Sequence, residues 1–144
     1  MPASATEQDI RAALLQHWAA SDANDFPTEH QIYCDDAVPD YPQSGERVRG
    51  RANIQASRSK QPSKKRFHVR RILGSGDLWI TEYIITYDEK PFHTVSIMEF
   101  RDGKVAHETQ YSVNRLHQQP RDPLCGTDWS SVHPHRIAIR RGYN

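Results

Sequence analysis

Polar side chains that could transfer protons fall on the predicted inner faces of two neighbouring strands. Glu108, Gln110 and Ser112 share one face of the last predicted strand, 105–113, and Ser96 lies on the strand before it. Successive side chains of a strand point to opposite faces, so this spacing keeps the polar set together. Burial among apolar groups disfavours a charged carboxylate. We therefore expect a raised pKa for Glu108 and a role for it in proton transfer.

His17 is a second candidate for proton transfer. It lies on the apolar stripe of an amphipathic helix predicted over 7–20, together with Ile10, Ala13, Leu14 and Trp18. Imidazole titrates near neutral pH, so His17 could complement Glu108 in abstracting a proton next to a carbonyl. Both residues also have a structural alternative. His17 would then be a histidine hydrogen-bonded in the core, and Glu108 would pair with a nearby arginine or lie at a dimer interface.

The region that must position these groups is predicted as an antiparallel meander over 77–113. Its first strand, 78–87, is rich in β-branched and aromatic residues, and Asp102-Gly103 marks the last hairpin. Trp79, Thr81 and Tyr83 face inward if the turn after Tyr87 keeps the parity; otherwise Glu82 does. Polar groups occur on both faces, so we expect one face to line a cavity. The ligand-binding residues predicted there are Trp79, Tyr83, Met98, Gln110 and Ser112, and the outer face carries His93, Val95 and Ile97.

The rest of the chain supplies helices and an outer strand. In order, the pattern predicts a helix over 26–33, a turn over 42–45, a short strand over 46–49 and a helix over 51–60. Asp25 is the expected N-cap of the short helix, and Pro27 fits its first turn. The basic run 64–71 alternates as an outer strand with solvated charges, which protect an edge from pairing with other chains. This interpretation is favoured over a nucleic-acid site.

Composition and charge narrow the partners that we expect. The 144 residues carry 19 Lys and Arg against 18 Asp and Glu, and a net charge of +1 favours neither nucleic acid nor a membrane surface. No run of about 18 apolar residues and no signal-peptide pattern occurs. Cys34 and Cys125 form neither a disulfide framework nor a zinc spacing, which predicts reduced thiols in a cytoplasmic protein. His133 and His135 lack a third ligand, so we expect no metal.

Helices followed by a long antiparallel meander predict an α+β fold, a cone-shaped barrel in which a strongly curved sheet wraps the N-terminal helices. Three segments carry a family resemblance: the run Ile32 to Ile54 (IYCDDAVPDYPQSGERVRGRANI), Gly76 to Glu82 (GDLWITE) and Met98 to Val105 (MEFRDGKV). They resemble the SnoaL-like branch of the nuclear-transport-factor-2-like superfamily, which includes polyketide cyclases and is related in fold to ketosteroid isomerases. The resemblance covers 7–111. We expect one domain over 1–116, and an extension over 117–144 that packs on the body or a partner or is partly disordered.

The resemblance implies roles at particular positions. An oxyanion-hole tyrosine of the ketosteroid isomerases aligns with His17, and their general base, an aspartate before a proline, aligns with Tyr41. Their oxyanion-hole aspartate aligns with Ser96. The acid-base aspartate of the polyketide cyclases falls within 112–114, where this chain has no carboxylate. Asp40 lies beside Tyr41 but points to the other face of a strand. The implied catalytic set is therefore His17, Tyr41, Ser96 and Glu108, with Tyr41 and Ser96 donating to a developing oxyanion.

Two classes of function follow. The first is a small-molecule enzyme of the SnoaL-like type, an isomerase, cyclase or lyase without cofactor, doing acid-base chemistry (isomerisation, cyclisation, or hydration and elimination) on an apolar carbonyl-containing ligand. The second is a non-catalytic small-molecule-binding or dimeric assembly module. The apolar outer face predicts a homodimer in either case. An epoxide hydrolase of this fold requires two carboxylates and an arginine around a water, and we expect this chain to supply that set only if Asp40 turns inward.

Overall fold

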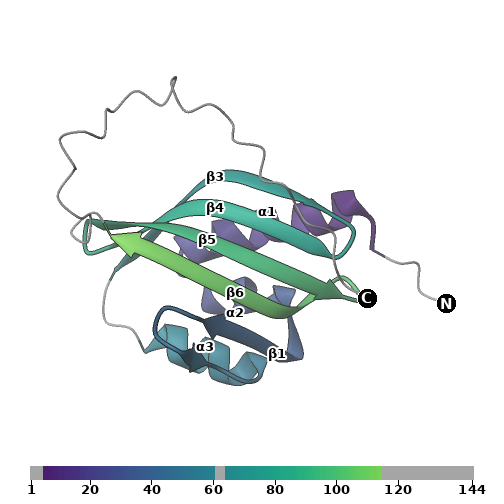
Figure 1. Cartoon of the computed structure of the whole chain (residues 1–144), viewed down its shortest axis with the longest axis horizontal. Helices are drawn as coiled ribbons and strands as arrows, with labels where there is room; N and C mark the ends of the chain where they lie inside the picture. Colours follow the sequence, from purple (N-terminus) through teal and green to yellow (C-terminus); the bar gives the residue numbers. More distant parts are fainter. Residues whose placement is uncertain (1–4, 61–63, 115–144) are drawn as a thin grey trace, which may run out of the picture.

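A computed structural model describes residues 5–60 and 64–114 of the chain. The helices are α1 (Glu7–Asp22), α2 (Phe26–Glu29), the 3-10 turn η1 (His30–Ile32) and α3 (Arg51–Ser59). The strands are β1 (Tyr33–Tyr41), β2 (Glu46–Arg47), β3 (Lys65–Ser75), β4 (Leu78–Tyr87), β5 (Lys90–Arg101) and β6 (Lys104–Asn114). They form one six-stranded sheet in the order β2-β1-β6-β5-β4-β3 (Figure 1). The predicted α+β class is confirmed. Residues 117–144, predicted as an extension, lie outside the described residues.

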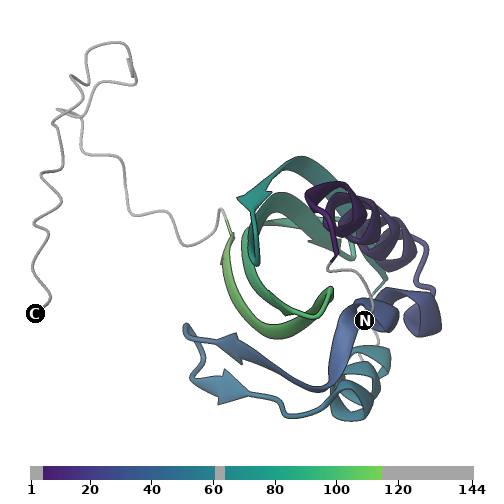
Figure 2. The same ribbon diagram turned by 90° about the vertical axis from the view of Figure 1, so that its right-hand side faces the viewer.

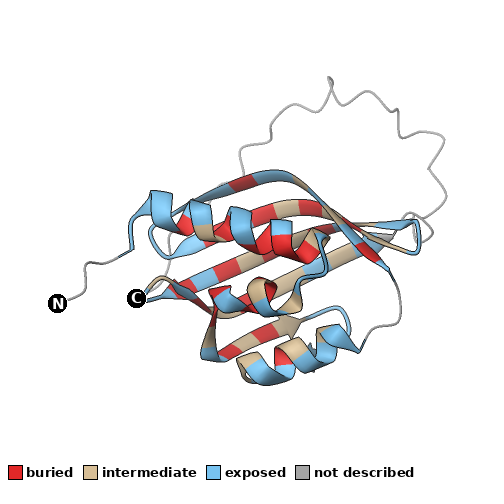
Figure 3. Cartoon of the chain, turned by 180° about the vertical axis from the view of Figure 1, so that it is seen from behind, coloured by how far each residue is buried: buried red, intermediate tan, exposed pale blue. Residues whose placement is uncertain are grey.

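The sheet is strongly curved, and helices cover its concave side. Figure 2 shows β3 to β6 bending around an interior that α1 and α2 close. All neighbouring strands are antiparallel except β1 and β6, which run parallel. Buried positions lie on the helix sides that face the sheet and alternate along the strands (Figure 3). The predicted curved, mostly antiparallel sheet around N-terminal helices is therefore confirmed.

Local signals fix the helix ends. Thr6 and Asp9 form the capping box of α1, and the Asp25 side chain accepts a hydrogen bond from the Thr28 N–H at the start of α2. The helix predicted over 26–33 is shorter than expected. After Glu29 the chain tightens into η1, and Tyr33 already has extended backbone and begins β1. This early end matters because it moves Tyr33 from a helix into the sheet.

Alternation correctly predicts which side chains point inward. Trp79, Thr81 and Tyr83 are buried, so the turn after Tyr87 keeps the parity and Glu82 faces outward. On β5 the buried set is Thr94, Ser96, Met98 and Phe100. The strand β5 begins at Lys90, three residues before its predicted start.

A register shift in β6 brings Glu108 inward together with Val105. Phe100 pairs with Val105 whereas Glu99 pairs with His107, so Ala106 is an extra residue in β6. Without this bulge, residues 105 and 108 would point to opposite faces. Both are buried, with exposed fractions of 0% and 1%. The bulge therefore lets one strand contribute both a core valine and an inward carboxylate.

The strand β1 was not predicted, although it completes the inner wall. Its sequence YCDDAVPDY has adjacent acids and a proline, which weaken a strand pattern. Pairing compensates, because Pro39 lies opposite Glu108 and Asp40 opposite Thr109 in the parallel register with β6. β1 thereby carries Tyr33 and Tyr41 to the neighbourhood of Glu108. Among the described residues, no helix is long and apolar enough to cross a membrane.

Candidate active site

The curved sheet and the helices enclose a pocket of about 310 Å³. Its apolar walls include the aromatic rings of Trp18, Phe67, Tyr83, Tyr87 and Phe92. Polar groups gather at one part of the wall, supplied by α2, α3, β1, β3 and β6: Glu29, Tyr41, Arg58, Lys65, Glu108, Gln110 and Ser112. A concave pocket of this size, in which aromatic walls and polar groups converge, is typical of small-molecule sites.

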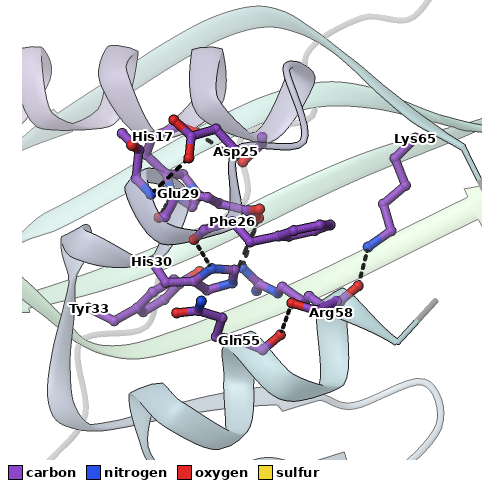
Figure 4. Close-up of polar contacts among 12 residues, drawn as sticks. His17, Asp25, Phe26, Glu29, His30, Tyr33, Gln55, Arg58 and Lys65 are labelled. Atoms are coloured by element: carbon purple, nitrogen blue, oxygen red, sulfur yellow. Dashed lines mark hydrogen bonds and ion pairs between the residues drawn. The ribbon is translucent and has the colours of Figure 1, made fainter.

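The guanidinium of Arg58 is the centre of the polar groups. Its Nη1 donates to the Tyr33 hydroxyl at 3.0 Å and lies 3.4 Å from the Glu29 carboxylate. Its Nη2 lies 3.2 Å from the Glu108 carboxylate and 3.5 Å from the Tyr41 hydroxyl. The Tyr33 hydroxyl in turn donates to Glu108 at 2.6 Å. We call Glu29, Tyr33, Arg58 and Glu108 the arginine cluster; Figure 4 shows how the first three converge.

Burial makes these contacts strong. The side chains of Arg58, Glu29 and Glu108 are only 15%, 7% and 1% exposed. Burial alone would raise the pKa of Glu108, but the Arg58 guanidinium and the hydrogen bond from Tyr33 oppose it, and the pKa lies below its ordinary value. The raised pKa expected for Glu108 is therefore wrong, because the sequence argument considered burial without the arginine. Glu108 is ionised at neutral pH.

Both buried histidines are committed to backbone carbonyls. His17 Nδ1 lies 2.6 Å from the Glu29 carbonyl oxygen and His30 Nδ1 lies 2.6 Å from that of Phe26. A carbonyl accepts, so each Nδ1 carries the proton and donates. The Nε2 atoms of both rings are buried and have no hydrogen-bond partner among the described residues, although His30 Nε2 lies 4.0 Å from the Glu29 carboxylate. Burial lowers the pKa of both imidazoles despite the nearby carboxylates, so both rings are neutral.

The structure brings together five of the nine predicted site residues. Tyr41, Tyr83, Glu108, Gln110 and Ser112 line the pocket. The other four, His17, Trp79, Ser96 and Met98, are buried behind its wall. Ser96 shares a 2.7 Å hydrogen bond with the hydroxyl of Tyr83, and His17 packs edge-on against Tyr33. The placement of His17 matches its structural alternative, and Ser96 is likewise a hydrogen-bonded residue of the core; catalytic roles for both stay predictions.

Trp79 illustrates a core position that the pattern alone could not separate from a ligand contact. Its indole N–H donates to the Gly76 carbonyl at 2.9 Å, and its ring covers Gly74. A Cβ on Gly74 would lie 2.5 Å from the indole, so only glycine allows this approach. Trp79 is therefore held against the sheet, away from the pocket.

The sequence analysis missed Glu29, Tyr33, Arg58 and Lys65. Glu29 and Arg58 belong to short, polar helices where charged residues usually face solvent. Asp40 does face outward, as expected, where it accepts hydrogen bonds from Arg47 and His107. However, the conclusion that two carboxylates and an arginine could not be assembled without Asp40 is wrong, because Glu29 and Glu108 flank Arg58.

Within 5–60 and 64–114 no group of three potential ligands could hold a metal; His133 and His135 lie outside these ranges.

Removing the buried cation should be costly for the fold. We expect Arg58→Met to lower the free energy of unfolding by about 3–5 kcal/mol, because Glu29 and Glu108 would remain buried without their partner. The double variant Arg58→Met/Glu108→Gln should be more stable than Arg58→Met. Urea denaturation at pH 7 measures both. The control is Arg47→Met, which removes a surface pair and should cost less than about 1 kcal/mol. Equal losses for the Arg58 and Arg47 variants would contradict the buried cluster.

The lowered pKa of Glu108 also predicts a pH dependence of stability. Because the folded-state pKa lies below the unfolded-state value, Glu108 stabilises the fold above that value and loses this contribution as pH falls through the folded-state pKa. The stability difference between wild type and Glu108→Gln should therefore narrow as the pH falls below about 4.3. Glu46→Gln is the control, since Glu46 is exposed and has no salt bridge among the described residues. A difference that widens on acidification would show that Glu108 is protonated in the folded protein.

Comparisons with known proteins agree with this architecture. The chain matches an NTF-2 like protein of unknown function from Burkholderia xenovorans LB400 at 59% identity and a TM-score of 0.74, over 80% of this chain and 90% of that one. An LEH-like epoxide hydrolase from M. tuberculosis is 20% identical, with a TM-score of 0.65 over 74% of this chain and 84% of the other. A protein with a ketosteroid isomerase-like fold from Catenulispora acidiphila DSM 44928, in complex with trimethylamine, is 11% identical, with a TM-score of 0.61 over 74% and 86%.

The two lower identities show a shared fold only. No curated protein matches the chain significantly. The SnoaL-like domain family matches residues 12–108, which contain the arginine cluster and seven of the nine predicted site residues; Gln110 and Ser112 lie just beyond this range. The chain therefore belongs to the SnoaL-like domain family, within the NTF2-like cone fold that its sequence resembles.

Proposed function

We propose that this protein is a small-molecule enzyme that performs cofactor-independent acid-base chemistry on an apolar, carbonyl-containing ligand. The observation that carries the proposal is the ionised Glu108 carboxylate, which is almost fully buried yet lines an aromatic pocket. Isomerisation, cyclisation and hydration or elimination all begin with proton transfer by such a group.

Tyr41 supplies the complementary donor. Its hydroxyl accepts a hydrogen bond from Arg58 Nη2 at 3.5 Å, so its own proton stays available for a ligand oxygen. When Glu108 removes a proton next to a carbonyl, negative charge develops on that oxygen. A preorganised donor at this point contributes about 3 kcal/mol to the barrier reduction. Arg58 sits behind both groups and keeps Glu108 anionic.

The pocket favours a neutral, apolar ligand. Arg58 already contacts two carboxylates and two tyrosine hydroxyls, so it has little capacity left for a ligand carboxylate. The aromatic walls would cover apolar surface of the ligand. We assign positioning roles to the residues behind the wall: His17 fixes the backbone of Glu29, and Ser96 fixes the hydroxyl of Tyr83.

A second candidate function is hydrolysis of an apolar epoxide. The observation that favours it is the pair of carboxylates, Glu29 and Glu108, bound to one arginine beside the Tyr41 hydroxyl. One carboxylate would take a proton from a water molecule as the water oxygen attacks an epoxide carbon. The C–O bond of that carbon would break, and the Tyr41 hydroxyl would protonate the released epoxide oxygen. The LEH-like relative shares the fold at 20% identity, so the support comes from this chain's own residues.

The activity test compares both chemistries on one set of variants. The probes are a cyclic β,γ-unsaturated ketone, followed by its conjugated product, and an apolar epoxide, followed by its diol in ¹⁸O-labelled water. Glu108→Gln should lower kcat/KM by about 10²–10⁴ because it removes the base. Tyr41→Phe should lower it by about 10²–10³ because it removes one donor.

Asp40→Asn is the matched control, since Asp40 is the neighbour of Tyr41 but faces outward. Folding is checked by circular dichroism and ligand binding by the change in tryptophan fluorescence, since Trp18 lines the pocket. A folded Glu108→Gln variant with full activity would reject the assignment of the base. Binding without turnover of either probe would instead support a non-catalytic binding module of the same fold.

We further propose that the protein is a homodimer joined through the convex face of the sheet. Ile80, Tyr111 and Val113 are 37%, 44% and 54% exposed there. The strand register places them on one face. Ile80 on β4 lies opposite Ile97 on β5, and Tyr111 on β6 lies opposite Val95 on the same strand β5. Such an apolar patch on a curved sheet needs cover, and a second copy provides a self-complementary surface.

Sedimentation velocity tests the dimer. We expect wild type to sediment as a dimer at micromolar concentration and Tyr111→Glu as a monomer, because the charge would be buried in the interface. Leu15→Glu should remain dimeric, since Leu15 is equally exposed but lies on α1, outside the sheet. Monomeric wild type across the concentration range would remove this proposal.

A further inference from the structure

Lys65 is a lysine in the pocket wall whose amine the acid-base chemistry does not use. It is the first residue of β3, pairs with Tyr87 at the end of β4, and is only 7% exposed. Its neighbour Lys64 is exposed. Alternation at the start of the strand thus turns one lysine into the pocket and leaves the other in solvent. Figure 4 shows the Lys65 side chain reaching toward Arg58.

The charged form of the Lys65 amine is stabilised by few neighbouring groups. Its Nζ donates one hydrogen bond, to the backbone carbonyl of Arg58 at 3.2 Å. Among the described residues no carboxylate lies within salt-bridge distance of it. Burial lowers the pKa of Lys65, the Glu29 carboxylate raises it and the Arg58 guanidinium lowers it, and the pKa lies below its ordinary value. A larger share of the amine is therefore neutral and nucleophilic than in an exposed lysine.

We propose that Lys65 captures a small apolar aldehyde or ketone in this pocket as an imine. The lone pair of Nζ attacks the carbonyl carbon, and the carbonyl electrons move to the oxygen, which takes a proton from nitrogen. The carbinolamine then loses water, with the second proton from nitrogen leaving on the oxygen, and a C=N bond remains. No oxidant or reductant is required, and water reverses the step. The inference shares the pocket with the proposed function but does not require turnover or Glu108.

The competing role for Lys65 is structural. Its ammonium would cap the end of α3, because the carbonyl of Arg58 lies in the last turn of that helix and helix C-termini favour cations. An arginine at position 65 would keep a charged donor for this carbonyl but could not form an imine. The substitution Lys65→Arg therefore separates the two roles.

The experiment traps the imine with benzaldehyde and sodium cyanoborohydride at neutral pH. Reduction converts the C=N bond into a stable benzyl-amine, and peptide mapping by mass spectrometry locates it. We expect Lys65 to be modified about tenfold faster than any exposed lysine, because a desolvated amine is deprotonated more often. Lys65→Arg should abolish this fast phase, whereas Lys64→Met, the adjacent exposed control, should keep it.

Glu108→Gln is included so that the two proposals fail separately. If Glu108→Gln loses turnover but keeps fast modification of Lys65, both proposals stand. If Glu108→Gln keeps its turnover while Lys65 is still modified, only the acid-base assignment fails. In the wild-type protein, modification of Lys65 at the rate of the exposed lysines, or no modification at all, overturns the imine proposal. This outcome does not depend on whether the variants fold.

Discussion

The burial of one guanidinium determines how the pocket is built. Arg58 is 15% exposed, and a charge in such surroundings is tolerated only when it is paired and hydrogen-bonded. Its partners come from three other elements, namely α2, β1 and β6, so these elements and α3 must meet at one point. The Arg58 guanidinium also lies 5.3 Å from the centre of the Tyr33 ring, which adds a cation–π contact. A ligand pocket with fixed charges follows from this requirement.

The sheet features that looked irregular serve the same requirement. The extra residue at Ala106 points Glu108 inward, and the parallel pairing of β1 with β6 places Pro39 opposite Glu108. Tyr33 and Tyr41, at the two ends of β1, then reach Arg58 from both sides. The bulge in β6 and the parallel strand β1 thus allow the arginine cluster to assemble inside the sheet.

The sequence predicted what depends on local periodicity. The inward set of β4 and β5, the Asp25 N-cap of α2 and the cone fold follow from alternation, capping preference and family resemblance. Local patterns could not predict β1, because its acids and Pro39 weaken the strand pattern and only its pairing with β6 stabilises it. They also could not predict the carboxylate partners of Arg58, which lie 29 and 50 residues away along the chain. The predicted direction of the pKa shift of Glu108 was wrong for the same reason. Burial can be inferred from a pattern, but the charge that compensates it comes from a distant segment.

The position of the carboxylate also separates this chain from the enzymes it resembles. Where the resemblance places the general base and the oxyanion-hole aspartate of ketosteroid isomerases, this chain has Tyr41 and Ser96, and neither side chain is a carboxylate. The anion comes instead from β6, as Glu108, and it is kept ionised by an arginine from α3. Under the proposed function, the base would therefore lie on β6, and Tyr41 on β1, which accepts a hydrogen bond from that arginine, would donate to the ligand oxygen. The shared fold preserves the pocket, while the distribution of charge along its wall sets the chemistry.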